Sequence, residues 1–156
     1  MTDRLQHPPR PCAADHAPDP VADRLRVGYQ VIGLDWRYVF VNNAAAAHGR
    51  RTPAELEGRT MMEMYPGIEQ TPMFDVLRRC MTERIALVME NLFEFPDGQQ
   101  RWFEVRAEPS PDGINVFSFD IHERKVVELE AAAARAAFAR LPLPVRLLKS
   151  VFGGHG

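Results

Sequence analysis

Long apolar runs, cysteines and an excess of either charge are the features that this sequence lacks. No run approaches the roughly 20 apolar residues that span a bilayer, and the N-terminus has no apolar signal-peptide core. The chain holds only two cysteines, Cys12 and Cys80, which fits a reducing cytoplasm and argues against a disulfide framework. Its net charge of −2 provides no basic surface for nucleic acid. We therefore expect a cytoplasmic protein that binds neither nucleic acid nor membranes.

Motifs of catalysis and of metal binding are also missing. The sequence has no Gly-x-Ser-x-Gly motif, no glycine-rich phosphate loop and no histidine beside a serine or cysteine motif. No cluster of histidine, cysteine and carboxylate residues has the spacing of a metal site. We expect neither an enzyme nor a metal centre. A small α+β enzyme remains the alternative, and a paired carboxylate or a histidine facing the core would favour it.

The size and composition are those of one globular domain. The chain has 156 residues, of which 46% are hydrophobic and 26% are charged. Residues 1–20 carry five prolines and few apolar anchors, which predicts a disordered tail. Residues 21–27 can form a short helix capped by Asp19, with Pro20 at its first position. We expect the domain itself over residues 21–125 and a helical extension over residues 126–156.

Three strands joined by two copies of one turn dominate the second half. The predicted strands are Ile85–Phe95, Gln99–Ser110 and Ile114–Ile121. Pro96-Asp97-Gly98 and Pro111-Asp112-Gly113 stand between them. In such turns proline presets φ near about −65° and glycine takes a positive φ. Aromatic and β-branched runs on both sides of these turns predict hairpins.

The first half predicts a further hairpin, followed by short helices. The strands of this hairpin are Tyr29–Leu34 and Tyr38–Val41. Asn42 can cap the first helix, Ala44–His48. Thr52 and Glu55 form a capping box that begins the second helix. The remaining helices are Met61–Tyr65 and a longer, amphipathic one from Thr71 to about Arg84.

This order of elements predicts an α+β domain. We expect a five-stranded antiparallel sheet with short helices on one face, flanked by N- and C-terminal helices. Phe103, Val105 and Ala107 share one face of their strand, while Trp102 lies on the other. Apolar side chains therefore occur on both faces of the sheet. We expect the helix of residues 21–27, or a second copy of the chain, to cover the outer face.

A further helix is predicted after Lys125, from Val126 to about Arg140. Its apolar residues, spaced 3, 4 and 3 apart, form a short heptad seam of Val126, Leu129, Ala133 and Ala136. Leu141–Pro144 ends this helix. Residues 145–152 predict a short apolar and basic helix, for which attachment to a membrane surface is a weak alternative.

Three segments resemble parts of one known domain family. Tyr38–Ala45 looks like a second strand followed by an asparagine and a helix, and Thr52–Thr60 looks like a short helix that ends in a glycine. Arg101–Val105, with Pro109 and Asp112-Gly113, looks like the last two strands. Asp120–Lys125 looks like an Asp-Ile-Thr signalling motif in which His122 takes the place of threonine. The span from about Val27 to Lys125 thus resembles a PAS domain.

The resemblance implies a sensory and dimerisation module of bacterial-type two-component signalling. It implies a pocket between the sheet and the short helices. It also implies that a signalling motif couples the sheet to the C-terminal helix, with the residues Asp120, Ile121, His122, Glu123 and Arg124. We interpret Asp120 and Arg124 as a hinge pair; solvated linker charges are the alternative. Only about thirty residues follow the motif, so we expect a homodimer that signals to a partner protein in trans.

Two cofactors of the family are not supported. Covalent flavin photochemistry needs a cysteine in the segment that corresponds to residues 60–70, which has none. Haem usually needs a histidine on the longer helix, and residues 71–84 have none. We interpret Cys80 as a half-buried thiol and His48 as an exposed residue at a helix end. His122 could change its charge near neutral pH and move the strand exit, or be an exposed linker residue.

Methionine is concentrated in one region. Six of the seven methionines fall between Met61 and Met89, and methionine suits adaptable sites because it is flexible and polarisable. One interpretation is a pocket for a small apolar ligand, walled by Met62, Met64, Phe74, Leu77, Met89 and Phe103. The alternative is a core that methionine simply fills, in a ligand-free dimerisation module. The sequence does not identify the ligand.

Overall fold

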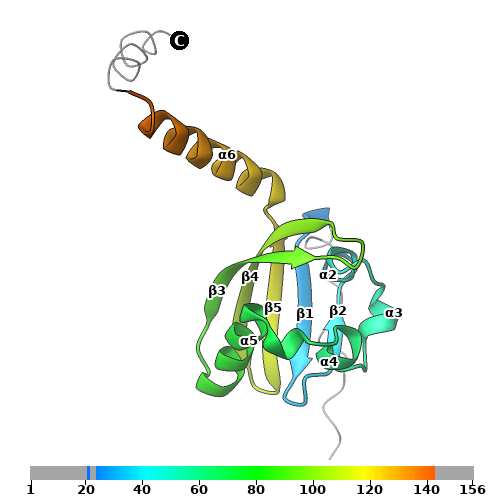
Figure 1. Cartoon of the computed structure of the whole chain (residues 1–156). Coiled ribbons are helices and arrows are strands. Elements are labelled where there is room, and N and C mark those ends of the chain that lie inside the picture. The colour runs from blue at the N-terminus through cyan, green and yellow to red at the C-terminus, as the bar shows by residue number, and fades with distance from the viewer. Residues whose placement is uncertain (1–20, 22–23, 143–156) are drawn as a thin grey trace, which may run out of the picture. The chain divides into compact units, whose positions relative to one another are not determined.

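The computed structural model describes residue 21 and residues 24–142 of the chain. Figure 1 shows the sheet, the short helices and the last helix. The strands are β1 (Gly28–Gly33), β2 (Tyr38–Val41), β3 (Leu87–Glu94), β4 (Gln100–Ser110) and β5 (Gly113–Asp120). The helices are α2 (Asn43–His48), α3 (Pro53–Leu56), α4 (Met61–Met64), η2 (Ile68–Gln70), α5 (Pro72–Glu83) and α6 (His122–Ala139).

The strands form one five-stranded antiparallel sheet, as the sequence predicts. Their order is β2-β1-β5-β4-β3, so the first strand of the hairpin lies in the interior of the sheet. β1 pairs with β5 in a continuous antiparallel register from Gly28 opposite Ser118 to Gly33 opposite Gly113. β1 also pairs with β2, with a bulge between Val31 and Ile32. The α+β fold class is therefore confirmed.

Contacts within the chain define two compact units. The first contains the residues up to Asn91 together with Glu104–Asp120. The second contains Leu92–Phe103 and the residues from Ile121 onward. The first unit holds most of the sheet and the helices α2 to α5, and the second holds the β3–β4 turn and α6.

The pairing of β1 with β5 separates the two faces of the sheet in the first unit. Successive side chains of a strand point to opposite faces, and Ser118 contacts His48 of α2, so the Ser118 row faces the helices. Ile114 and Val116 lie in that row and are buried. Helices α2 to α5 lie over this face in Figure 1.

The opposite face carries an aromatic cluster. Tyr29 lies opposite Phe117 in the β1–β5 register. Their ring centroids are 5.1 Å apart in a stacked arrangement, and the ring of Phe40 lies 5.7 Å from that of Tyr29. All three side chains are partly exposed. The expected apolar character of the outer face is therefore present in the first unit.

Local sequence signals place the short helices accurately. The capping box of Thr52 and Glu55 is present, as predicted from the sequence. A second capping box, of Thr60 and Glu63, begins α4. Each glutamate accepts the backbone N–H of its threonine, at 2.7 Å for Glu55 and 2.9 Å for Glu63, and this bond lowers the pKa of both carboxyl groups. These boxes fix where each short helix begins.

Asn42 is the one buried polar side chain in the described part of the chain. Its Oδ1 accepts the backbone N–H groups of Tyr29 at 2.9 Å and of Ala45 at 2.8 Å. Its Nδ2 donates to the carbonyl oxygen of Val27 at 2.9 Å. One amide therefore caps α2 and also joins it to the start of β1, which explains the asparagine that the sequence places there.

The last helix begins earlier than the sequence predicts. We expected it at Val126, but α6 begins at His122, so that histidine is a helical residue rather than part of a linker. Ile121 is the N-cap residue of α6, and no side chain makes a capping hydrogen bond there. The expected helix of residues 145–152 lies outside the described residues, as do residues 22 and 23 of the expected helix of residues 21–27; the N–H of Leu25 donates to the carbonyl of Val21 at 3.0 Å. No helix among the described residues is long and apolar enough to cross a membrane.

Replacing Asn42 by alanine tests its role in joining α2 to β1. Asn42→Ala removes the cap and leaves buried backbone groups of Tyr29 and Val27 without their partner. We expect the free energy of unfolding to fall by about 2–4 kcal/mol, measured by urea denaturation. Asn43→Ala, at the exposed next position, should lower it by less. Equal effects of the two substitutions would contradict the assignment.

Candidate functional site

The methionine-rich region forms the buried side of α5 and its surroundings. Helix α5 buries Phe74, Leu77, Cys80 and Met81 against the first unit. Met61 is also buried, while the other four methionines of the region, Met62, Met64, Met73 and Met89, are half-buried. None of the six lies fully exposed. The amphipathic pattern therefore identified the buried face of α5, although Met73, which we placed on it, is only half-buried.

The six side chains proposed as a pocket lining divide between the two units. Phe74 and Leu77 are buried in the first unit. Met62, Met64 and Met89 are half-buried there. Phe103 is buried in the second unit, with 5% of its surface exposed. A pocket lined by these residues remains a prediction.

Trp36 contributes an aromatic contact that the sequence did not indicate. It closes the β1–β2 turn with φ of 66°, in the left-handed region that bulky residues seldom adopt. Its N–H donates to the carbonyl of Gly33 at 2.9 Å. Its ring lies 4.6 Å from that of Phe74, and the guanidinium of Arg78 lies 5.8 Å from the centre of the Phe74 ring. Oδ1 of Asp35 accepts the N–H of Arg37 across this turn at 3.2 Å. Packing on α5 helps to offset the unfavourable backbone conformation of Trp36.

His48 has a different environment from the one predicted. It is half-buried, and its Nδ1 lies 2.8 Å from Oγ of Ser118. A side chain at Gly28 would collide with both of these groups, so the contact requires a glycine at that position of β1. The contact joins α2 to β5, and its partners are 70 residues apart in the sequence. Helix-end reasoning could not find it because it depends on the register of the sheet.

Metal and thiol chemistry find no support among the described residues. No group of three or more His, Cys, Asp and Glu side chains there could hold a metal ion. Cys80 is fully buried, not half-buried as we expected, and burial raises the pKa of its thiol. A buried thiol with a raised pKa is a poor nucleophile. Cys80 therefore serves as a core residue.

The junction between β4 and α6, within the second unit, is where the signalling motif is best defined. The N–H of Ile121 donates to the carbonyl of Trp102 at 3.1 Å, as in a strand ladder. The carbonyl of Ile121 instead accepts the N–H of Lys125 at 2.8 Å, the first hydrogen bond of α6. The Trp102 N–H donates to Nδ1 of His122 at 3.4 Å. The chain therefore changes from strand to helix at Ile121 while both backbone groups of Trp102 remain bonded.

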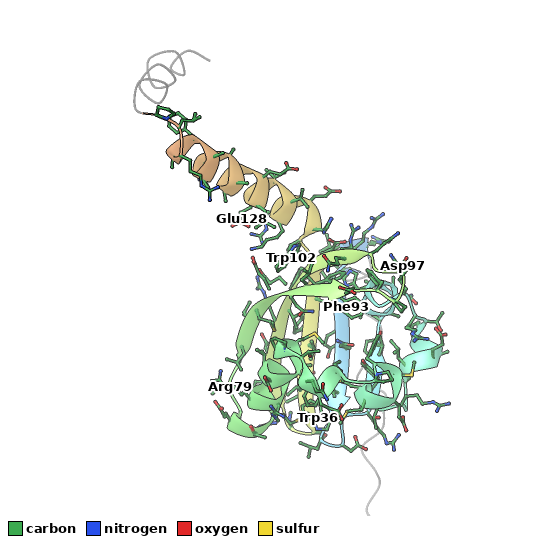
Figure 2. The ribbon with its side chains drawn as sticks, viewed as in Figure 1. Trp36, Arg79, Phe93, Asp97, Trp102 and Glu128 are labelled. Carbon is green, nitrogen blue, oxygen red and sulfur yellow. The ribbon has the colours of Figure 1, made fainter. Side chains whose placement is uncertain are left out.

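The side chain of Trp102 supports the same junction. Nζ of Lys125 lies 5.1 Å from the centre of the Trp102 ring, within the range of a cation–π interaction. Lys125 also pairs with Glu128 one turn further along α6, at 3.7 Å. Figure 2 labels Trp102 and Glu128 in this region. We call Trp102, Ile121, His122 and Lys125 the junction cluster.

Sequence reasoning found part of this cluster. Ile121 and His122 belong to the predicted motif, and both are half-buried. Glu123 and Arg124 are exposed on the first turn of α6, and Asp120 is exposed at the end of β5. The hinge pair of Asp120 and Arg124 stays a prediction. Trp102 was missed, although an indole on the strand face opposite Phe103 was a signal that it packs against another element.

Neutralising Lys125 tests the cation–π contact. Lys125→Gln removes the charge above the Trp102 ring, so we expect the first turn of α6 to open more often. The loss of about 0.5–1 kcal/mol should lower the hydrogen-exchange protection of the amides near Lys125 by about two- to fivefold. Arg124→Gln removes a neighbouring positive charge and should change this protection less. Equal effects would show that only the general charge of the turn matters.

Comparison with known proteins agrees with the fold. The family model described as PAS fold matches residues 22–126. A sensory box histidine kinase/response regulator from Burkholderia thailandensis E264 is a structural neighbour with 15% identity and a TM-score of 0.61, covering 78% of this chain and 96% of its own.

Two structures of VqmA are also similar. VqmA bound to DPO has 19% identity and a TM-score of 0.52, covering 60% of this chain and 51% of its own. The Vibrio cholerae VqmA dimer has 17% identity and a TM-score of 0.54, covering 62% of this chain and 47% of its own. This chain thus matches about half of VqmA. Among curated proteins, none matches the sequence. Since the family model covers most of the chain, including the sheet, the short helices and the start of α6, the chain belongs to the PAS fold family.

Proposed function

We propose that this chain is a PAS signalling module that forms a homodimer through α6 and passes a change at the junction cluster to a partner protein in trans. The observation that carries this proposal is α6 itself. It is 18 residues long and buries none of them, yet its first turn is tied to Trp102 by hydrogen bonds and a cation–π contact. An unburied helix obtains little stability from its own chain. A fixed first turn followed by a helix without a buried side chain suits a helix that docks on another one.

The surface of α6 carries a seam that fits a second copy. Val126, Leu129, Ala133 and Ala136 occupy a and d positions, and Leu129 is 49% exposed. In this register Lys125 takes a g position and Glu130 the next e position, five residues later. In a parallel two-stranded coiled coil, g and e residues with this spacing face each other across the helices. Opposite charges at these positions favour parallel pairing of two identical helices.

The aromatic cluster on the sheet supports the same proposal. Tyr29, Phe40 and Phe117 form a contiguous apolar surface on the face opposite the helices of the first unit. Partly exposed aromatic side chains are enriched where proteins associate. VqmA is described as a dimer, which adds a precedent for self-association among proteins of similar fold. Catalysis is not part of the proposed function.

Binding of a small apolar ligand is a second candidate function. The half-buried methionines Met62, Met64 and Met89 favour it, because side chains of this kind adapt to an irregular guest. VqmA is described as bound to DPO. Under this proposal the ligand would lie between α5 and the core-facing side of the sheet. A signal would then begin at that site and leave through the junction cluster.

A charge in the seam tests the homodimer. Ala133→Glu places two carboxylates in contact in a parallel pair, while Ala131→Glu makes the same change at an outer position of the heptad. We expect the full chain to be a dimer by sedimentation equilibrium. Ala133→Glu should raise its dissociation constant at least about tenfold, equivalent to about 1.4 kcal/mol, and Ala131→Glu should leave it unchanged. A monomeric full chain, or equal effects of both changes, would refute pairing through this seam.

A larger core side chain tests ligand binding. Native mass spectrometry of the purified protein should show a retained small molecule, and added ligand at 100 times its Kd should raise stability by about 2.7 kcal/mol. Leu77→Phe would fill a chamber beneath α5, so it should abolish the added mass. In a core that is already full, the same change costs about 1–3 kcal/mol and no mass is present in either protein. That second pattern would favour the ligand-free dimerisation module.

A further inference from the structure

The junction cluster contains one hydrogen bond that depends on the charge of a side chain. In a continuing antiparallel ladder, the N–H of Trp102 would donate to a backbone carbonyl of the facing strand. The carbonyl of Ile121, whose N–H already bonds to Trp102, accepts from Lys125 at 2.8 Å instead. Nδ1 of His122 occupies the acceptor position and receives the Trp102 N–H at 3.4 Å. An imidazole nitrogen therefore replaces a ladder carbonyl.

Only the neutral imidazole can make this bond. A neutral histidine has one donor and one acceptor nitrogen, so accepting at Nδ1 places its hydrogen on Nε2. A protonated histidine carries hydrogens on both nitrogens and has no acceptor. Protonation of His122 would therefore place an N–H against the N–H of Trp102. Trp102 would lose one of the two hydrogen bonds that join its backbone to the start of α6. The bond from the Ile121 N–H to the Trp102 carbonyl would remain.

The surrounding charges act in both directions. Lys125 and Arg124 on α6, and Arg101 beside Trp102 on β4, oppose a further positive charge. His122 is also the first residue of α6, where the helix dipole disfavours a cation. Glu123 and Glu128 on α6 carry the opposite charge. None of these charges changes the outcome at Nδ1, because an imidazolium has no lone pair to offer.

We propose that His122 makes the junction cluster sensitive to protons. Acid converts the acceptor of the Trp102 N–H into a donor, releases that N–H and loosens the first turn of α6. When the imidazole is neutral, the acceptor bond forms and the start of the helix is fixed. Threonine, the usual residue of the motif that His122 replaces, has no such titration. The step from the junction to the dimer rests on the proposed function, whereas the effect of the proton on the junction does not.

Selective labelling with ¹⁵N-tryptophan makes the bond directly observable in the full chain. The protein has two tryptophans, so its spectrum contains two backbone amide signals. Trp36 donates its N–H to Gly33 in the first unit and serves as an internal reference. Between about pH 5 and 8, the range in which histidines change charge, the Trp102 amide should follow a one-proton titration curve. Its exchange protection should be about fivefold lower at the acid end, as expected for the loss of one hydrogen bond.

Variants of His122 distinguish the acceptor from other causes. His122→Asn keeps an acceptor oxygen near the place of Nδ1 and does not titrate, so the Trp102 amide should stay constant. His122→Leu should hold the amide at its acid position throughout. His48→Asn should leave the titration as it is. An unresponsive Trp102 amide, the same curve in His122→Asn, or a parallel shift of Trp36 would overturn the proposal.

Sedimentation equilibrium at the same pH values separates this proposal from the proposed function. A titrating amide with a weaker dimer in acid supports both. A titrating amide with an unchanged dimer supports the proton-sensitive junction and counts against the transfer of the signal through α6. A dimer that weakens in acid while the amide stays constant counts against His122 as the proton acceptor.

Discussion

The pairing of β1 with β5 is the constraint on which the first unit depends. It joins segments at opposite ends of the domain, with Gly28 opposite Ser118 and Gly33 opposite Gly113. Both ends of the ladder need glycine: a side chain at Gly28 would meet His48 and Ser118, and one at Gly113 would meet the carbonyl of Ile32. Once this register is set, the buried row of Ile114 and Val116 faces the helices and the aromatic cluster faces away. A shift by one residue would exchange the two faces.

The transition from β5 to α6 determines where the last helix begins. After β5 the backbone changes from strand to helix at Ile121, and Trp102 bonds both to this residue and to the side chain of the next. Residues beyond this point have no buried side chain in α6. The first turn of the helix is joined to β4, and this is the arrangement on which the proposed transmission depends. The alanine-rich sequence of α6 favours the helical conformation, and a partner on its seam would add to its stability.

Features set by neighbouring residues could be predicted, and features set by register could not. The Thr52 box, the Asn42 cap, the Pro-Asp-Gly turns and the five strands follow from local chemistry and alternation, and all are present. His48 and Cys80 were assigned wrong environments because their partners or the elements that cover them are distant in the sequence. The contact between Trp36 and Phe74 could not be predicted because it joins the β1–β2 turn to a helix that is distant in the sequence. The proposed pocket could not be predicted from neighbouring residues either, because the packing of α5 decides whether these residues enclose a cavity.

Self-crosslinking through α6 tests the central claim most directly. In a Cys12→Ser background, a cysteine replaces Ala133 in the seam or Ala131 outside it, and the native protein is exposed to a mild oxidant while Cys80 stays buried. Parallel pairing places each a position opposite its own copy. The account predicts rapid formation of a disulfide-linked dimer for Ala133→Cys and little for Ala131→Cys. Equal rates at the two positions, or no linked dimer at either, would contradict it.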